Sequence, residues 1–217
     1  THELKTPLNS IINFSEYVKK SLINSKAEIE NREKLVQLLT VVHKNSMLLL
    51  ENVNDILDIA KLKSGKMNFL ISTFSINKMI NSEITNIHQH FDGILIDIVE
   101  NGEVLISTDE FRFKQIFTNI LSNAIKYGNK KIEINIFNDG SSVGFSIEDN
   151  GHGIKEKERV FELFEQEDSK NIDRVTKGTG VGLHFIKLLC ENLNLNYKLE
   201  DSIKLGGAKF TIYKGIK

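Results

Sequence analysis

The first part of the chain carries apolar residues at alternating steps of four and three, a spacing that places them on one face of a helix. The first such segment uses Leu4, Leu8, Ile11, Val18 and Leu22, with Ser15 at one polar place. After a polar stretch at 24–31, a longer segment repeats the spacing at Leu35, Leu39, Val42, Ser46, Leu49, Val53, Ile56 and Ala60. Two helices joined by a short loop predict an antiparallel hairpin, and one partner helix cannot cover both apolar stripes. We therefore expect a homodimer that forms a four-helix bundle; the alternative is a hairpin packed on the rest of its own chain.

The helical spacing ends near residues 63–66, where we place a boundary and a short linker. Beyond it we expect helices at 76–91, 108–127 and 183–192, and strands at 94–99, 132–136, 143–147, 195–199 and 209–213. The helix at 108–127 starts with Thr108 as a capping hydroxyl and stops at Gly128. Helices and mostly antiparallel strands in one core predict an α+β sandwich. The predicted domains are residues 1–66 and 67–217.

Length and composition exclude several classes of protein. A chain of 217 residues can form two modest domains, and 40% hydrophobic with 26% charged residues exclude a disordered or collagen-like chain. The net charge of -1 gives no overall field toward nucleic acid or anionic lipid. Cys190 is the single cysteine, so no intrachain disulfide forms. Without an apolar run for a membrane span or a signal peptide, we expect a cytoplasmic location, with membrane anchoring only through an upstream sensor region.

The segment Asp149–Gly153 places a carboxylate directly after a predicted strand. Gly151 and Gly153 let the backbone approach a ligand without an intervening Cβ atom. This arrangement is typical of a binding turn, although acidic residues beside glycine also occur in ordinary turns.

Two further segments suit phosphate chemistry. Residues 178–182 read Gly-Thr-Gly-Val-Gly ahead of an apolar helix, and amides at a helix start bind anions. The spacing is neither that of the dinucleotide-binding fingerprint nor that of a P-loop. Asn119, Asn123 and Lys126 share one helix face, where amide oxygens and an ammonium suit Mg²⁺ and phosphates. A merely solvated polar face is the alternative. The mostly polar stretch 155–177 indicates a mobile lid over such a site.

These segments together resemble the conserved boxes of sensor histidine kinases of two-component systems. Residues 113–127 resemble the N box, 149–153 the G1 box, 161–164 the F box, and 178–183 the G2 box. Residues 2–9, His-Glu-Leu-Lys-Thr-Pro-Leu-Asn, resemble the H box. The resemblance covers essentially the whole chain. It implies a dimerisation and phosphoacceptor hairpin followed by an α/β-sandwich ATPase domain of the histidine kinase and gyrase type.

The resemblance assigns the chemistry of the H box to three residues. His2 would be the phosphoacceptor, Glu3 the general base that holds and deprotonates its imidazole, and Thr6 the residue that helps water attack the phosphohistidine. Without the motif, each would be an ordinary residue of a helix surface. The remaining histidines are expected to be surface residues: His43, His88, His90, His152 and His184.

The resemblance also implies the residues that bind Mg²⁺ and ATP. Asp149 would accept a hydrogen bond from the adenine amino group, and Asn123 would ligate Mg²⁺. The other expected nucleotide-binding residues are Asn119, Lys126, Tyr127, Gly151, Gly153, Arg174, Gly178, Thr179, Gly180, Gly182 and Leu183. Tyr127 is alternatively a core aromatic residue, and Arg174 a solvated one. Lys177 stands where many relatives have glycine, and Thr1 begins the chain at the acceptor, where the family's first helix extends further upstream.

The implied reaction is phosphoryl transfer from magnesium-ATP to His2 and then to an aspartate of a response-regulator receiver domain, with phosphatase activity in bifunctional members. Two alternatives stay open. One is a dimeric ATP-binding scaffold that transfers nothing. The other is a gyrase-type ATPase that hydrolyses ATP without a phosphohistidine.

Overall fold

The computed structural model describes residues 2–24, 29–88, 93–163, 165 and 180–216. The chain divides into two compact units, Thr1–Ala60 and Lys61–Lys217. The domain boundary predicted at residue 66 lies just beyond the helix that ends at Lys63. No helix in the described part of the chain combines the length and the apolar character that a membrane span requires.

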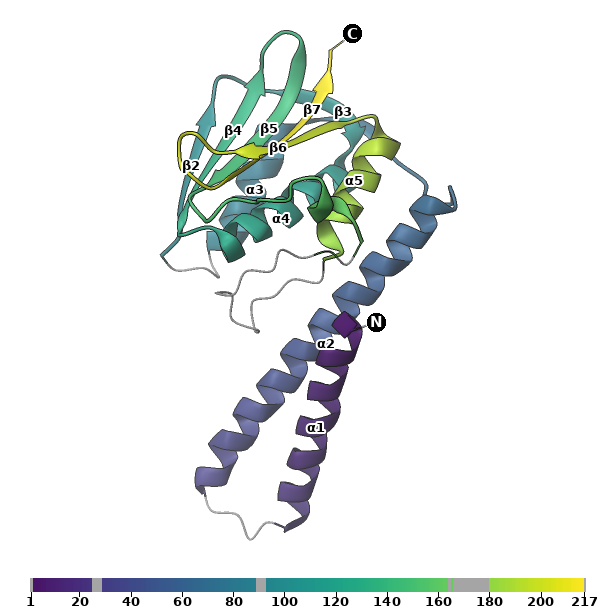
Figure 1. Ribbon diagram of the computed structural model, residues 1–217, viewed down its shortest axis with the longest axis vertical. Coiled ribbons are helices and arrows are strands. Elements are labelled where there is room, and N and C mark those ends of the chain that lie inside the picture. The colour runs from purple at the N-terminus through teal and green to yellow at the C-terminus, as the bar shows by residue number, and fades with distance from the viewer. Residues whose placement is uncertain (1, 25–28, 89–92, 164, 166–179, 217) are drawn as a thin grey trace. The chain divides into compact units, whose positions relative to one another are not determined.

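The first unit is the expected helical hairpin, built from α1 (His2–Asn24) and α2 (Ile29–Lys63). The two helices run antiparallel (Figure 1). The second helix begins at Ile29, inside the stretch predicted to be a loop.

Each helix of the hairpin carries two apolar stripes where the sequence suggested one. The inward stripe is at least half-buried and contains Ile11, Phe14, Val18, Leu35, Leu38, Val42, Leu49 and Ile56. The outward stripe is exposed and contains Leu8, Ile12, Val36, Leu39, Leu50, Val53 and Leu57. The predicted seam combined members of both, because Leu39 and Val53 satisfy the helical spacing as well as Val42 and Leu49 do. The structure therefore bears out that one partner helix does not cover all the apolar positions.

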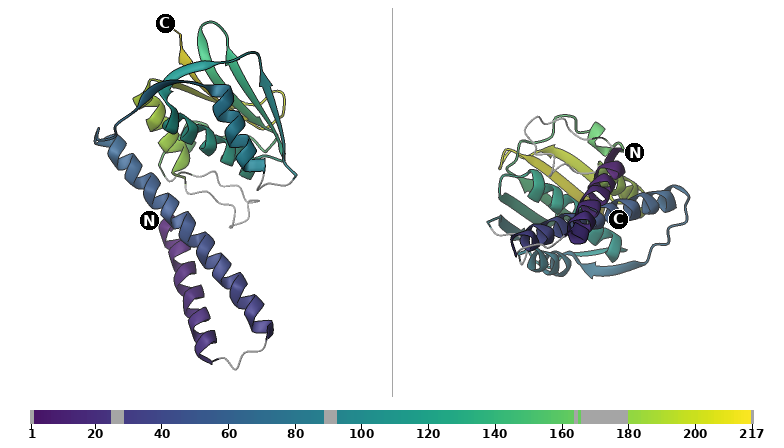
Figure 2. Two further views of the ribbon diagram at one scale, coloured as in Figure 1. Left: turned by 180° about the vertical axis from the view of Figure 1, so that it is seen from behind. Right: turned by 90° about the horizontal axis from the view of Figure 1, so that it is seen from below.

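The second unit is an α+β sandwich, as predicted. Its sheet has the order β2-β4-β5-β7-β6, in which β2 and β4 are parallel and the other pairs antiparallel. The strands are β2 (Leu95–Glu100), β4 (Lys131–Asn138), β5 (Ser142–Asp149), β6 (Asn196–Asp201) and β7 (Ala208–Gly215). Helices α3 (Ile76–His88), α4 (Glu110–Tyr127) and α5 (Gly182–Leu193) cover one face of this sheet (Figures 1 and 2). A short 3₁₀ helix, η1 (Arg159–Phe161), precedes α5.

Two short strands were not predicted. β1 (Ile71–Ser75) and β3 (Leu105–Asp109) pair antiparallel as a separate two-stranded sheet. Each has only five residues and adjoins a helix start, so neither displays enough alternation to be separated from the helical pattern that follows.

Aromatic rings from α4 and β5 form the centre of the core. The Phe145 ring lies edge-on to Phe113 and Phe117, with ring centroids 5.4 and 5.3 Å apart. All three side chains are fully buried. The alternation of 132–136 and 143–147 places Phe145 inward. The apolar face of the sheet therefore packs against the apolar face of α4 at this ring.

The helix that carries the predicted N box is capped by a different residue from the one expected. The Asp109 side chain accepts a hydrogen bond from the Arg112 amide, while Thr108 is fully buried. A carboxylate one residue closer to the helix takes the capping role. Asp109 Oδ2 also accepts from the Leu70 amide at 2.7 Å, which joins the start of α4 to the segment ahead of β1.

We predict that Phe145→Ala lowers the free energy of unfolding of the second unit by about 3–5 kcal/mol, because it removes a ring enclosed by two others. Phe111→Ala is the matched control, since that ring is 67% exposed, and it should change stability by less than about 0.5 kcal/mol. Urea unfolding followed by circular dichroism measures both. Equal losses for the two variants would contradict the placement of Phe145.

Candidate functional site

The carboxylate of Asp149 lies at the end of β5 and is 8% exposed. Its Oδ1 atom accepts hydrogen bonds from the Gly151 amide at 2.8 Å and the Ala208 amide at 3.3 Å. Burial raises the pKa of Asp149 above its usual range, although these two bonds and the nearby His152 oppose the shift. The site thus contains a sequestered carboxylate whose second oxygen accepts no hydrogen bond from the described residues.

Glycines surround Asp149 because no side chain fits there. A Cβ atom on Gly128 would lie 3.1 Å from the Asp149 Cβ and 2.2 Å from the Ala124 carbonyl oxygen. A Cβ atom on Gly151 would lie 2.3 Å from the Tyr127 carbonyl oxygen. Gly128 has a φ of −72°, so it does not adopt the left-handed conformation that its position at a helix end implied. Glycine is required there by close packing instead. The end of α4 therefore lies directly against the turn that follows β5.

The polar face of α4 adjoins the start of α5. Asn119 and Asn123 are half-buried and Lys126 is exposed. A Cβ atom on Gly182 would lie 3.2 Å from Asn119 Oδ1, so glycine permits this approach. The structure thus brings together two of the predicted segments, which are about 60 residues apart in the chain.

The start of α5 presents its first amides next to this polar face. Gly180 has a φ of +67°, a left-handed conformation that favours glycine, and α5 begins two residues later at Gly182. Val181 is buried and Leu183 is half-buried. A helix start with unpaired amides and a positive dipole suits an anion. Gly153 also has a positive φ, of +71°, in the turn after Asp149.

The expectation that His184 is a surface residue is wrong. Its side chain is half-buried, and its Nδ1 atom lies 2.9 Å from the Phe161 carbonyl oxygen. Phe161 is itself buried and lies beside Tyr197, with ring centroids 4.9 Å apart. His184 therefore joins α5 to η1. His43 and His152 are exposed, as expected.

Several predicted site residues lie outside the described residues: Arg174, Gly178 and Thr179, together with Lys177 and most of the expected lid. His88 falls in α3, but its side chain is not described, and His90 is also outside the described residues. His2, Glu3 and Thr6 fall in the first turns of α1, and their side chains are likewise not described.

The donor set fits Mg²⁺ better than a transition metal. Within the described ranges, no three His, Cys, Asp or Glu side chains come close enough to hold a metal ion. The half-buried amide of Asn123 could supply one hard oxygen ligand. Mg²⁺ accepts such a site because it keeps several water and phosphate ligands.

Sequence reasoning missed the part of the site formed by the segment ahead of β7. The Gly207 amide donates to the Asp149 carbonyl oxygen at 3.1 Å, and the Ala208 amide reaches the Asp149 carboxylate. The signal was the Gly206–Gly207 pair, which directly precedes a predicted strand.

Comparison with known families agrees with this geometry. Residues 108–215 match the family described as histidine kinase-, DNA gyrase B-, and HSP90-like ATPases. The second unit is therefore an ATPase domain of that class. Residues 1–65 match the histidine kinase A phospho-acceptor domain. The chain, which joins both domains, belongs to the sensor histidine kinases, and the gyrase-type alternative is not favoured.

Individual relatives support the same family. The chain is 33% identical to hybrid signal transduction histidine kinase B of Dictyostelium discoideum over its full length, and 28% identical to the circadian input-output histidine kinase CikA of Synechococcus elongatus over 98% of its length. It spans only 11% and 28% of those two proteins. Among solved structures, a chain of the histidine kinase AdeS of Acinetobacter baumannii has a TM-score of 0.75 at 18% identity, and the match covers 100% of this chain and 98% of that one. This last likeness concerns the fold alone.

We predict that Asp149→Asn stabilises the ligand-free protein at neutral pH. The Asn oxygen can keep both hydrogen bonds made by Asp149 Oδ1, while the buried negative charge is removed. Because the folded-state pKa of Asp149 is raised, ionisation begins to weaken the fold once pH exceeds the unfolded value of 3.8, and the loss is complete above the folded-state pKa. The difference in Tm between the two proteins should therefore be absent below pH 3.8 and grow as pH increases. Thermal unfolding across a pH series measures it, and an Asn variant that is less stable at pH 7 would contradict the prediction.

Proposed function

We propose that this chain is the kinase core of a sensor histidine kinase, which transfers the γ-phosphate of magnesium-ATP to His2 and then to an aspartate of a response regulator. The observation that carries the proposal is the convergence of Asp149, the end of α4 and the start of α5 in one ATPase-class domain. The joined phosphoacceptor domain supplies the other substrate of the reaction.

Asp149 would select adenine. Its free carboxylate oxygen would accept a hydrogen bond from the adenine amino group, whereas guanine presents a carbonyl oxygen that the carboxylate repels. The glycine cluster around it supports this role, because it lets three backbone segments close around the carboxylate and hold it in place. Gly151 and Gly153 would admit the base, and Tyr127 would pack against the nucleotide. ShkA, which is 24% identical to this chain with a TM-score of 0.64, was solved in complex with AMPPNP.

The polar face of α4 and the start of α5 would bind the triphosphate. Asn123 would hold Mg²⁺, which neutralises phosphate charge, and Asn119 would support it. Lys126 is exposed and would reach phosphate oxygens as a mobile cation. The amides of Gly180, Gly182 and Leu183 would surround the phosphates together with those of Gly178 and Thr179. Arg174 would stabilise charge on the transferring phosphoryl group.

Transfer to His2 would require little covalent chemistry from the protein. A neutral imidazole nitrogen attacks the γ-phosphorus, the bond to the bridging oxygen breaks, and ADP leaves with that electron pair. Glu3 accepts the proton from the other ring nitrogen, which leaves a phosphohistidine with an uncharged ring. In a bifunctional kinase, Thr6 would orient the water that hydrolyses the phosphohistidine to histidine and inorganic phosphate.

The outward stripe of the hairpin supports a homodimer. Leu50, Val53 and Leu57 are each at least 40% exposed, and they recur at helical spacing on one face of α2. A second copy of the hairpin would bury such a stripe in a four-helix bundle. A receiver domain of a response regulator would then dock near His2 to accept the phosphoryl group.

We predict that γ-labelled ATP gives an acid-labile, base-stable phosphoprotein with the unaltered chain and none with His2→Ala. ATP binding by His2→Ala should stay unchanged, because the acceptor is outside the ATPase domain. His43→Ala, which alters an exposed histidine of α2, is the matched control and should keep its label. Label incorporated by His2→Ala would overturn the assignment of the acceptor, and ATP binding without any label in the unaltered chain would favour the scaffold alternative.

We also predict that the double variant Leu50→Glu, Leu57→Glu weakens dimerisation by about a hundredfold or more, because two charges would be buried in the bundle. Gln37→Glu adds one charge at an exposed polar position of the same helix and should leave the dimer intact. Sedimentation equilibrium gives the dissociation constants. A dimer that persists unweakened in the double variant would contradict the role of this stripe, and a monomeric unaltered chain would favour a hairpin that packs on its own chain.

A further inference from the structure

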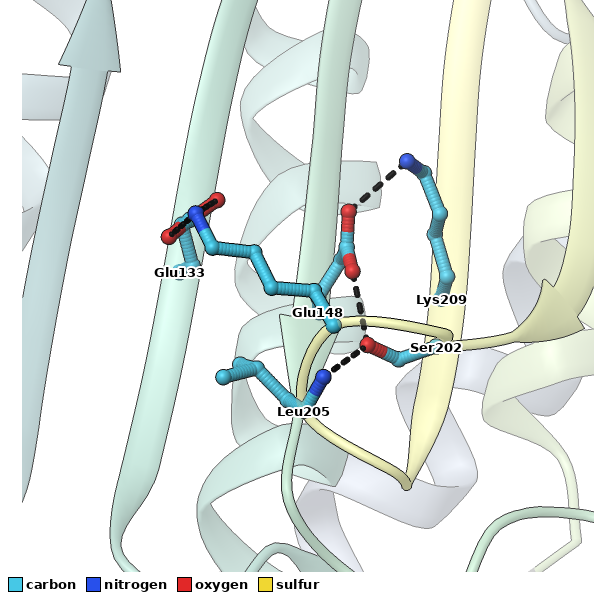
Figure 3. A network of polar contacts seen from close by, with 6 residues as sticks. Glu133, Glu148, Ser202, Leu205 and Lys209 are labelled. Carbon is cyan, nitrogen blue, oxygen red and sulfur yellow. Dashed lines mark hydrogen bonds and ion pairs between the residues drawn. The ribbon is translucent and has the colours of Figure 1, made fainter.

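A polar network occupies the face of the sheet that the helices leave open (Figure 3). Ser202 Oγ donates to Glu148 Oε2 at 2.7 Å, and Lys209 Nζ lies 2.7 Å from Glu148 Oε1. Beside this pair, Lys204 Nζ donates to Glu133 Oε1 at 2.7 Å. The network thus ties the turn between β6 and β7 to the neighbouring strands β4 and β5.

Ser202, the first residue of that turn, makes most of its hydrogen bonds. Its hydroxyl oxygen accepts a hydrogen bond from the Leu205 amide at 2.9 Å, and its carbonyl oxygen accepts one from the Gly206 amide at 2.8 Å. Its own amide donates to the Gly207 carbonyl oxygen at 2.8 Å. Ser202 is 3% exposed, so loss of its hydroxyl would leave Glu148 and the Leu205 amide without this partner in a buried place.

The far end of the same turn contacts Asp149. A Cβ atom on Gly207 would lie 2.2 Å from Asp149 Oδ1 and 2.5 Å from its carbonyl oxygen. The amides of Gly207 and Ala208 donate to these two oxygens. Because Glu148 and Asp149 are neighbours in β5, their side chains point to opposite faces of the sheet. The turn and the residue after it therefore contact the end of β5 on both faces of the sheet. Ser202 donates a hydrogen bond to Glu148 on one face, and the Ala208 amide donates one to Asp149 on the other.

The negative charge of Glu148 strengthens its hydrogen bonds to Ser202 and Lys209. Burial alone would raise the pKa of Glu148, but hydrogen bonds from Lys209 and Ser202, with the positive charge of Lys209, outweigh burial and leave the pKa lowered. Glu148 therefore accepts both bonds as a carboxylate at neutral pH, and charge-assisted bonds are stronger than neutral ones.

We propose that Ser202, together with Glu148 and Lys209, is a positioning residue for base selection: it holds the β6–β7 turn so that the Ala208 amide orients the Asp149 carboxylate toward the base. The inference rests on the proposed adenine-binding role of Asp149. Ser202 itself touches no nucleotide in this arrangement. A residue with a merely structural role would lower stability without changing which base is preferred, so the preference separates the two roles.

The test compares ATP and GTP binding to the full chain by isothermal titration calorimetry. Ser202→Ala should reduce the ratio of ATP affinity to GTP affinity by about tenfold, the effect of one misaligned charged hydrogen bond. Ser202→Thr keeps the hydroxyl and should restore the ratio. Lys209→Met, which removes the other partner of Glu148, should shift the ratio in the same direction as Ser202→Ala and decides the question if that variant does not fold.

Asp139→Ala is the matched control. Asp139 accepts hydrogen bonds from Ser141 and Ser142 in the turn between β4 and β5, so its loss loosens a turn of the same sheet without touching Asp149. It should lower Tm and leave the ATP-to-GTP ratio unchanged. Folded Ser202→Ala or Lys209→Met protein that keeps the ratio within about twofold would overturn the positioning role while Asp149→Asn still loses the preference. An unaltered chain without any preference for ATP would instead refute the role of Asp149 and the inference with it.

Discussion

The close contact between the end of β5 and the glycines around it is the constraint on which the ATPase domain depends. Gly128, Gly151 and Gly207 come from three separate segments, and a side chain on any of them would collide with the backbone or with Asp149. The contact fixes where α4 ends, where the β5 turn begins and where β7 starts. It also holds a carboxylate in a buried place that its ionised form does not favour.

Much of this arrangement follows from the pattern of residues. The change from helical spacing to period two separates the hairpin from the sandwich, and the alternation in 132–136 and 143–147 places Phe145 in the core. The polar residues Asn119 and Asn123 were recognisable because asparagine is a weak helix former, and the two lie on one face of the helix with Lys126. Local chemistry was enough for these features.

Features decided by packing between distant segments were not predictable in the same way. Spacing could not separate the inward stripe from the outward one, because adjacent positions such as Leu38 and Leu39 both satisfy it. The cap at Asp109 depends on a strand that was not expected, and the burial of His184 depends on η1. Ala208 contributes its backbone amide, and because every residue except proline has one, the residue type gave no sign of this contact.

The proposed nucleotide site would draw on four stretches of chain that lie between residues 119 and 208. A ligand that touches all of them would act as a cross-link present only in the folded domain, and binding to the folded state alone adds to its stability. The steady-state amount of intact protein would then rise and fall with the supply of nucleotide.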